Sequence, residues 1–142
     1  MLESRNIFKL CFAILLLVSY LNSGAQNTFI ENKGQFPKQV KAKVNLPSGS
    51  LFIEEGKLIY TFYSKTHLAA IHDLDEEKKE IDAHTYAAEF LNYSQEVSTE
   101  FLEESKYYEN YFLRKNSEWA TRVKSYKKLY LKDIYKGIDV KY

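Results

Sequence analysis

The sequence contains few of the residues on which cross-linked or catalytic sites are usually built. It has one cysteine, three histidines, two prolines and five glycines in 142 residues. A single cysteine excludes a disulfide within the chain. The glycines form no phosphate-binding loop, and no serine lies in a Gly-x-Ser-x-Gly elbow. These absences exclude a disulfide scaffold, a P-loop nucleotide site and a nucleophile elbow.

Net charge is also nearly absent. The chain has 20 Lys and Arg against 19 Asp and Glu, a formal net charge of +1. Binding to nucleic acid relies on an excess of basic residues that neutralise phosphates. We therefore expect no nucleic acid as the main partner.

The longest apolar run is short and lies near the N-terminus. Arg5 and Lys9 come first, an apolar run follows over residues 10–21, and the small residues Ser23 and Ala25 come next. This order is the pattern of a secretory signal peptide. A membrane-spanning helix needs about 20 apolar residues, and this run is shorter. We therefore expect a cleaved leader and not a membrane anchor.

The expected cleavage site lies before Gln26. It divides the chain into a signal peptide, residues 1–25, and one domain, residues 26–142. Cleavage also removes the only cysteine, Cys11. The mature protein is expected in the periplasm, at the cell surface or outside the cell, and it is not expected to span a membrane.

The mature chain is rich in tyrosine and in alternating patterns. Aromatic residues make up 15% of the sequence, and 12 residues are tyrosines. Apolar and polar residues alternate as in half-buried strands, with turns at residues 47–50 and 55–56. Strands are expected in seven segments: 39–46, 51–54, 57–63, 84–93, 97–103, 125–135 and 137–142.

These segments predict a mainly β fold. Strands that follow one another through short turns favour an antiparallel, β-sandwich-like sheet. Residues 64–82 are expected to form a short helical or loop insertion. The chain stops within the segment GIDVKY, residues 137–142. We therefore expect a domain that is incomplete at its C-terminus. If the partner of this strand lies beyond Tyr142, the isolated chain has an exposed edge and should self-associate.

No catalytic, cofactor-binding or metal-ligating residue is predicted. His67 and His72 flank an acidic run, but a spacing of five does not place two ligands on one helical face. They are better interpreted as solvated loop residues, and His84 as a residue at the start of a strand. No spacing singles out a carboxylate pair for acid–base chemistry.

An aromatic cluster is the candidate binding surface. The segment KYYENYF contains Tyr107, Tyr108 and Tyr111, and Trp119 follows nearby. Exposed aromatic side chains can bind glycans or a protein partner. The alternative, which we favour, is that alternate rings enter the core and the others cover its edge.

The segment FIENKGQF, residues 29–36, opens the mature chain. We expect Phe29 and Ile30 to anchor it on the sheet and Gly34 to allow a turn before Pro37. The polar side chains are expected to bond to the backbone around that turn: Glu31, Asn32, Lys33 and Gln35.

Four segments of the mature chain resemble, in their order, those of a known family of domains. They are FIENKGQF, HTYAAEF, YYENYFL and LYLKDIYKGIDVKY. The sequence is similar to the N-terminal domain of large exported proteins of the Bacteroidetes. Such proteins continue with β-propeller-like repeats, PKD or other immunoglobulin-like domains, and a sorting domain for type IX secretion of the gliding-motility kind. The resemblance covers essentially the whole mature chain. Its structural motif residues are Phe29, Glu31, Asn32, Lys33, Gly34, Gln35, Gly137 and Asp139.

Two positions depart from the resembled pattern, both in expected turns. Arg114 stands where the family tends to have glycine, and Lys136 replaces a proline. The resemblance implies a non-catalytic structural or binding module and no enzyme activity. The alternatives are a glycan-binding accessory module and a hydrolase-associated domain. The implied partners are the rest of the parent polypeptide, another cell-envelope protein or a glycan.

Overall fold

Every regular element in the described residues is a β-strand. The computed structural model describes residues 27–64, 82–112 and 119–142. Within them, no helix is long and apolar enough to cross a membrane. The strands are β1 (Phe29–Glu31), β2 (Ala42–Leu46), β3 (Gly49–Ile53), β4 (Lys57–Tyr63), β5 (Ala83–Glu89), β6 (Ser98–Tyr111), β7 (Ala120–Tyr135) and β8 (Ile138–Lys141).

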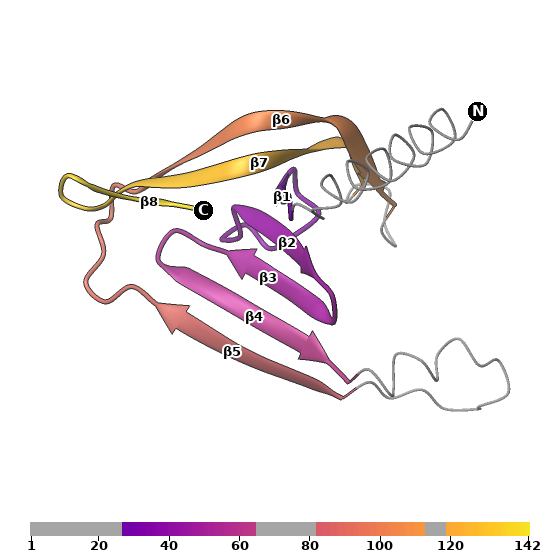
Figure 1. Cartoon of the computed structure of the whole chain (residues 1–142), viewed down its shortest axis with the longest axis horizontal. Coiled ribbons are helices and arrows are strands. Elements are labelled where there is room, and N and C mark those ends of the chain that lie inside the picture. Colours follow the sequence, from indigo (N-terminus) through magenta and orange to yellow (C-terminus); the bar gives the residue numbers. More distant parts are fainter. Residues whose placement is uncertain (1–26, 65–81, 113–118) are drawn as a thin grey trace, which may run out of the picture.

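The strands form one antiparallel sheet that folds over itself. Their order is β5-β4-β3-β2-β1-β7-β6, and β8 also pairs with β7. Figure 1 shows the long β6–β7 ribbon crossing above the layer formed by β2 to β5, with β1 between them. The prediction of a mainly β, antiparallel fold is confirmed. Most of the predicted insertion, residues 65–81, lies outside the described residues.

Strand β1 joins the two layers although it has only three residues. One edge pairs with β2, placing Ile30 opposite Lys43. The other edge pairs with β7, placing Phe29 opposite Tyr126 and Ile30 opposite Ser125. The apolar start of FIENKGQF therefore becomes a strand in the middle of the sheet.

Strand β8 pairs with β7, so the last segment has a partner within the described residues. The expected incompleteness at the C-terminus stays a prediction. The backbone pairing continues to Tyr142, whose N–H donates to the carbonyl of Leu129 at 2.9 Å. Strands β8 and β1 thus share one edge of β7. The rings of Phe29 and Tyr142 lie 6.4 Å apart where these strands approach each other.

The main core lies between the two layers. Ala42, Val44 and Ile53 of β2 and β3 cluster with buried residues of β7, which are Leu129, Leu131 and Ile134. Alternation explains this arrangement, because every second residue of a strand points to the same face. In the predicted strand 39–46, the alternate apolar residues Ala42, Val44 and Leu46 lie in this core or pack against it.

A second cluster forms around β1. Ile30 packs with Ala120 and Val123 from the start of β7, and Phe36 and Tyr111 cover them. Neighbouring residues of a strand point to opposite faces, so Phe29 contributes to the main core and Ile30 to this second cluster. One short strand thus connects two hydrophobic clusters.

Strands β6 and β7 of the long ribbon are longer than predicted. Bulges interrupt the alternation of apolar and polar residues, and the prediction relied on that alternation. Strand β6 continues to Tyr111, and register shifts separate its pairing with β7 into parts. Arg122 and Asp133 lie at register shifts of β7 and have positive φ angles of 53° and 54°. Such positions change which face the following side chains occupy. A strict period of two therefore underestimates the length of β6.

Replacing Leu129 by alanine tests the core. Leu129 is fully buried on β7 between the layers. Leu129→Ala should lower the free energy of unfolding by about 2–5 kcal/mol, because it leaves a cavity. Equilibrium urea unfolding measures this change. Lys127→Ala, at an exposed position of the same strand, is the control and should change stability by less than ~0.5 kcal/mol. Equal effects of the two variants would contradict this core.

Candidate functional site

The segment after β1 forms a hydrogen-bonded loop centred on Asn32. Its Nδ2 donates to three carbonyl oxygens across the loop, those of Phe36 at 3.2 Å, Pro37 at 3.0 Å and Val40 at 2.8 Å. Its Oδ1 accepts the N–H groups of Gly34 at 2.9 Å and Phe36 at 3.2 Å. One side chain thereby satisfies backbone groups on both sides of the turn.

Gln35 and Gly34 complete this loop. The Nε2 of Gln35 donates to the carbonyl of Glu31 at 2.6 Å, and its Oε1 accepts the N–H of Lys33 at 2.7 Å. Gln35 is one of the two buried polar residues that the described part contains. Gly34 has a φ of 105°, a conformation that side chains disfavour. The loop is therefore held by its own side chains.

Glu31 and Lys33 attach the loop to β7. The Oε1 of Glu31 accepts the N–H of Lys124 at 2.8 Å. The Nζ of Lys33 donates to the carbonyls of Thr121 at 3.1 Å and Arg122 at 3.4 Å. These groups lie beside the bulge at Arg122, where regular pairing with β6 is interrupted. We call Glu31, Asn32, Lys33 and Gln35 the clasp.

A cavity of about 510 Å³ lies beside the clasp. Part of its wall is the loop and part is β6, so two segments distant in sequence enclose it. Its lining mixes charged, polar and aromatic side chains, which suits a polar group or an extended segment more than a wholly apolar ligand. The lining residues are Glu31, Asn32, Gly34, Phe36, Lys38, Val40, Lys41, Thr99 and Phe101.

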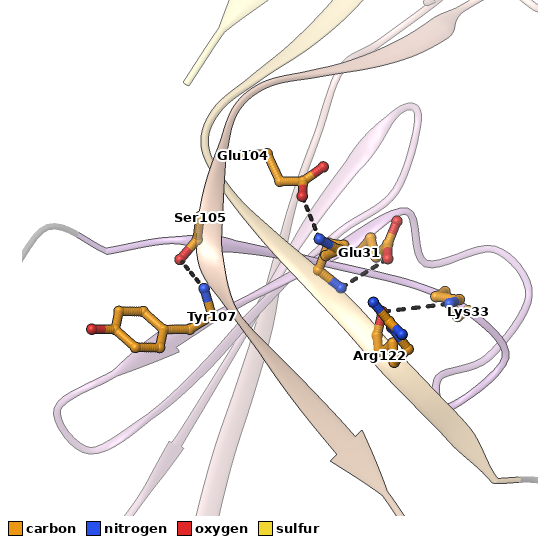
Figure 2. Close-up of polar contacts among 7 residues, drawn as sticks. Glu31, Lys33, Glu104, Ser105, Tyr107 and Arg122 are labelled. Atoms are coloured by element: carbon orange, nitrogen blue, oxygen red, sulfur yellow. Dashed lines mark hydrogen bonds and ion pairs between the residues drawn. The ribbon is translucent and has the colours of Figure 1, made fainter.

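Tyr107 and Tyr108 of the predicted binding surface lie at a wide bulge of β6. The register of the β6–β7 pairing shifts between Glu104 and Tyr108. Within this bulge, the Oγ of Ser105 accepts the N–H of Tyr107 at 3.2 Å. Tyr107 is 83% exposed, and Figure 2 shows it pointing away from Glu31, Lys33 and Arg122. Tyr108 is about half exposed, with the guanidinium of Arg122 5.7 Å from its ring centre.

Tyr111 and Trp119 have different surroundings. Tyr111 packs edge-on against Phe36 at 5.7 Å and donates its hydroxyl to Glu109 at 2.6 Å. Burial, and secondly the hydrogen bond to Glu109, raise the pKa of Tyr111, so its phenol stays neutral. Trp119 meets Phe112 at 5.1 Å, and both are exposed. The four predicted residues share one end of the ribbon, but Tyr111 belongs to the second cluster.

The structure also brings together aromatic residues that the sequence analysis did not single out. Tyr60 and Phe62 of β4 stack with Tyr86 of β5, at 5.0 Å and 6.2 Å between ring centres and 12° and 22° between ring planes. His84 lies 6.2 Å from Tyr86. Alternation places these residues on one face of each strand, but only the pairing of β4 with β5 places the rings side by side.

The C-terminal motif residues hold the β7–β8 hairpin. Asp139 accepts the N–H of Asp133 at 2.9 Å, and Asp133 accepts the N–H of Gly137 at 3.1 Å. Gly137 has a φ of 74° and Asp133 one of 54°. The two carboxylates thus satisfy the backbone where β7 bulges and turns.

The charged groups of the clasp engage backbone atoms. Among the described residues, no three His, Cys, Asp or Glu side chains gather in a way that could hold a metal ion. His67 and His72 lie outside these residues. The arrangement of the clasp can position strands and present a surface.

Comparison with known proteins places the chain in a family. A family model described as "Domain of unknown function (DUF7948)" matches residues 29–142. The chain therefore belongs to this family, whose matched region begins at Phe29 and includes all eight strands. No curated protein and no solved structure matches the chain.

Replacing Asn32 by aspartate tests the clasp. The substitution keeps the shape of the side chain but puts an oxygen where Nδ2 donates to three carbonyls. Asn32→Asp should lower the free energy of unfolding by about 1–3 kcal/mol, because these acceptors lose their donor. Equilibrium urea unfolding at pH 7 measures it.

The matched control is Asn45→Asp. Asn45 is exposed on β2, so the same chemical change should alter stability by less than ~0.5 kcal/mol. If Asn32→Asp is as stable as this control, Asn32 does not organise the loop.

Proposed function

We propose that this DUF7948 domain is a non-catalytic structural or binding module at the front of a large exported protein of the Bacteroidetes. The proposal rests on the hydrogen bonds that the side chains of FIENKGQF make to the backbone. Glu31 and Lys33 bind the backbone of β7, and Asn32 and Gln35 bind the backbone of their own loop. A segment with this arrangement stabilises a fold and does not present reactive groups.

A rigid sheet with exposed loops and bulges suits recognition of a neighbouring domain. Loops that a rigid scaffold positions commonly carry binding residues. Here the wide bulge of β6 displays Tyr107 at the surface, beside the half-exposed Tyr108. The proposed partners are the rest of the parent polypeptide or another protein of the cell envelope.

The sequence preceding the domain supports export. Residues 1–25 have the charge, apolar run and small residues of a leader, and the family match begins at residue 29. The proposed location is the periplasm, the cell surface or the medium. Passage through a type IX secretion route belongs to the same proposal and rests on the sequence resemblance.

A glycan-binding accessory module is the second candidate. Large exposed aromatic side chains favour it, because a sugar ring can stack on them. Tyr107 is 83% exposed, Phe112 65% and Trp119 46%. Tyr111 is not available in the same way, because its ring covers the second cluster.

Export can be measured directly. The chain expressed with its own leader in a Bacteroidetes host should appear outside the cytoplasm, with residues 1–25 removed. Cell fractionation followed by intact-mass spectrometry checks both points. A variant with Arg5 and Lys9 replaced by glutamate is the control and should remain inside, because the leader needs its positive segment. A wild-type protein that keeps its leader in the cytoplasm would contradict the proposal.

A glycan array separates the two candidate functions. If the aromatic residues form a glycan site, wild-type protein should bind a defined set of sugars, and Tyr108→Ala and Trp119→Ala should each weaken that binding at least tenfold. A tenfold loss corresponds to about 1.4 kcal/mol, which is within the range that one aromatic stacking contact contributes. Tyr63→Ala on β4, in the other layer of the sheet, is the matched control and should bind as wild type does. Absence of binding by the wild type would leave the structural module as the function.

A further inference from the structure

Strand β5 presents a long unpaired edge. It pairs with β4 over seven consecutive positions, Lys57↔Glu89 to Tyr63↔Ala83, without a register shift. No other strand in the described residues pairs with β5, and all seven of its residues are exposed. Figure 1 shows β5 as the outermost strand of its layer.

Two hydrogen bonds determine which backbone groups point outward. The N–H of Ser64 donates to the carbonyl of Asp82, and the N–H of Phe90 donates to the carbonyl of Gly56, both at 2.9 Å. In an antiparallel pair, bonded and non-bonded positions alternate. The even-numbered residues of β5 therefore bond to β4. The odd-numbered residues direct their N–H and C=O groups outward: Ala83, Thr85, Ala87 and Glu89.

Within the described residues, this edge lacks the bulges, lysines and prolines that protect many sheet edges. Proteins block exposed edges with bulges, lysines, prolines or very short strands. On the opposite edge, β6 has register shifts and carries ion pairs to β7 such as Glu100–Lys132 at 2.6 Å. Strand β8 has only four residues. Strand β5, with the sequence AHTYAAE, contains no lysine, proline, glycine or bulge.

We propose that β5 pairs with the β5 of a second copy of this chain, forming a two-fold symmetric dimer. In one register, every outward N–H and C=O group of β5 finds a partner on the β5 of the other copy. This register places Tyr86 opposite Tyr86, Thr85 opposite Ala87 and Ala83 opposite Glu89. A shift of two residues loses part of this pairing. A symmetric interface of this kind needs a self-complementary surface.

The side chains of β5 meet this requirement. The only carboxylate of β5, on Glu89, faces Ala83 in the proposed register and already pairs with Lys57 at 2.9 Å. His84 faces Ala88. No like charges therefore meet directly across the two strands, an arrangement that would be destabilising.

Tyr86 is the central residue of the proposed interface. Its ring stacks on Tyr60 at 5.0 Å, yet its side chain remains 48% exposed at the edge of the sheet. In the dimer the two Tyr86 residues form a non-bonded pair, in which backbones approach most closely. The aromatic stack of one copy then continues into that of the other. A second copy is the occupant that supplies the same ring and the same small, neutral neighbours at the two-fold axis.

The association is independent of the proposed function and can be measured on the purified protein. Sedimentation velocity from about 1 µM to about 1 mM should show a concentration-dependent monomer–dimer equilibrium, as for a weak association. Ala87→Pro removes one outward N–H and no bond to β4, so it should shift the protein to monomer with unchanged circular dichroism. Ala87→Ser keeps the N–H and should dimerise as wild type does.

A charge exchange at Tyr86 tests the register itself. Tyr86→Lys and Tyr86→Glu should each be monomeric, because like charges would meet at the two-fold axis. Mixed in equal amounts, the two variants should form a heterodimer. A wild-type protein that stays monomeric over the whole range overturns the proposal, and so does a dimer that persists in both single variants. The Tyr86 variants decide the question even if Ala87→Pro fails to fold.

Discussion

The pairing of β7 on both edges is the constraint on which the rest of the structure depends. Along one edge β7 pairs with β6, and along the other it pairs with β1 and then with β8. Through β1 it also connects to the layer of β2 to β5. Leu129 and Leu131 can bury their side chains against Ile53 only because β1 brings that layer beneath β7. A three-residue strand thus holds the two layers of the sheet together.

The clasp explains how so short a strand can hold this position. Three residues of pairing offer few backbone hydrogen bonds, and short strands are marginal by themselves. The side chains that follow β1 add further bonds, from Glu31 and Lys33 to β7 and from Asn32 around the loop. Ile30 adds an apolar contact with Val123 on the opposite face. The segment FIENKGQF is therefore the part of the molecule that fastens its two layers together.

The two outer edges of the sheet, β6 and β5, present different surfaces. The ribbon displays its aromatic residues at a bulge and carries cross-strand ion pairs, which protect the β6 edge but contribute little to stability because they are exposed. The opposite edge, β5, is regular, weakly charged and lined by a stack of tyrosines. One end of the sheet is thus suited to recognition by side chains, and the other to pairing through the backbone.

The sequence alone determined the strand character of most of the domain and the inward face of β2, because alternation reports directly which residues leave water. It also determined that Asn32 and Gln35 bond to the backbone of their own turn, since Asn, Gln and Gly near a turn do so over a few residues. The same expectation was wrong for Glu31 and Lys33, which bond to the distant strand β7 instead. Only the tertiary structure decided the rest. The extent of β6 and β7 depends on register shifts next to Tyr107, Arg122 and Asp133, which break the period of two. The partner of β8, the junction role of β1 and the stacking of Tyr60 with Tyr86 depend on pairings between distant segments. Local patterns carry no information on such pairings, because each strand offers the same backbone groups to any neighbour.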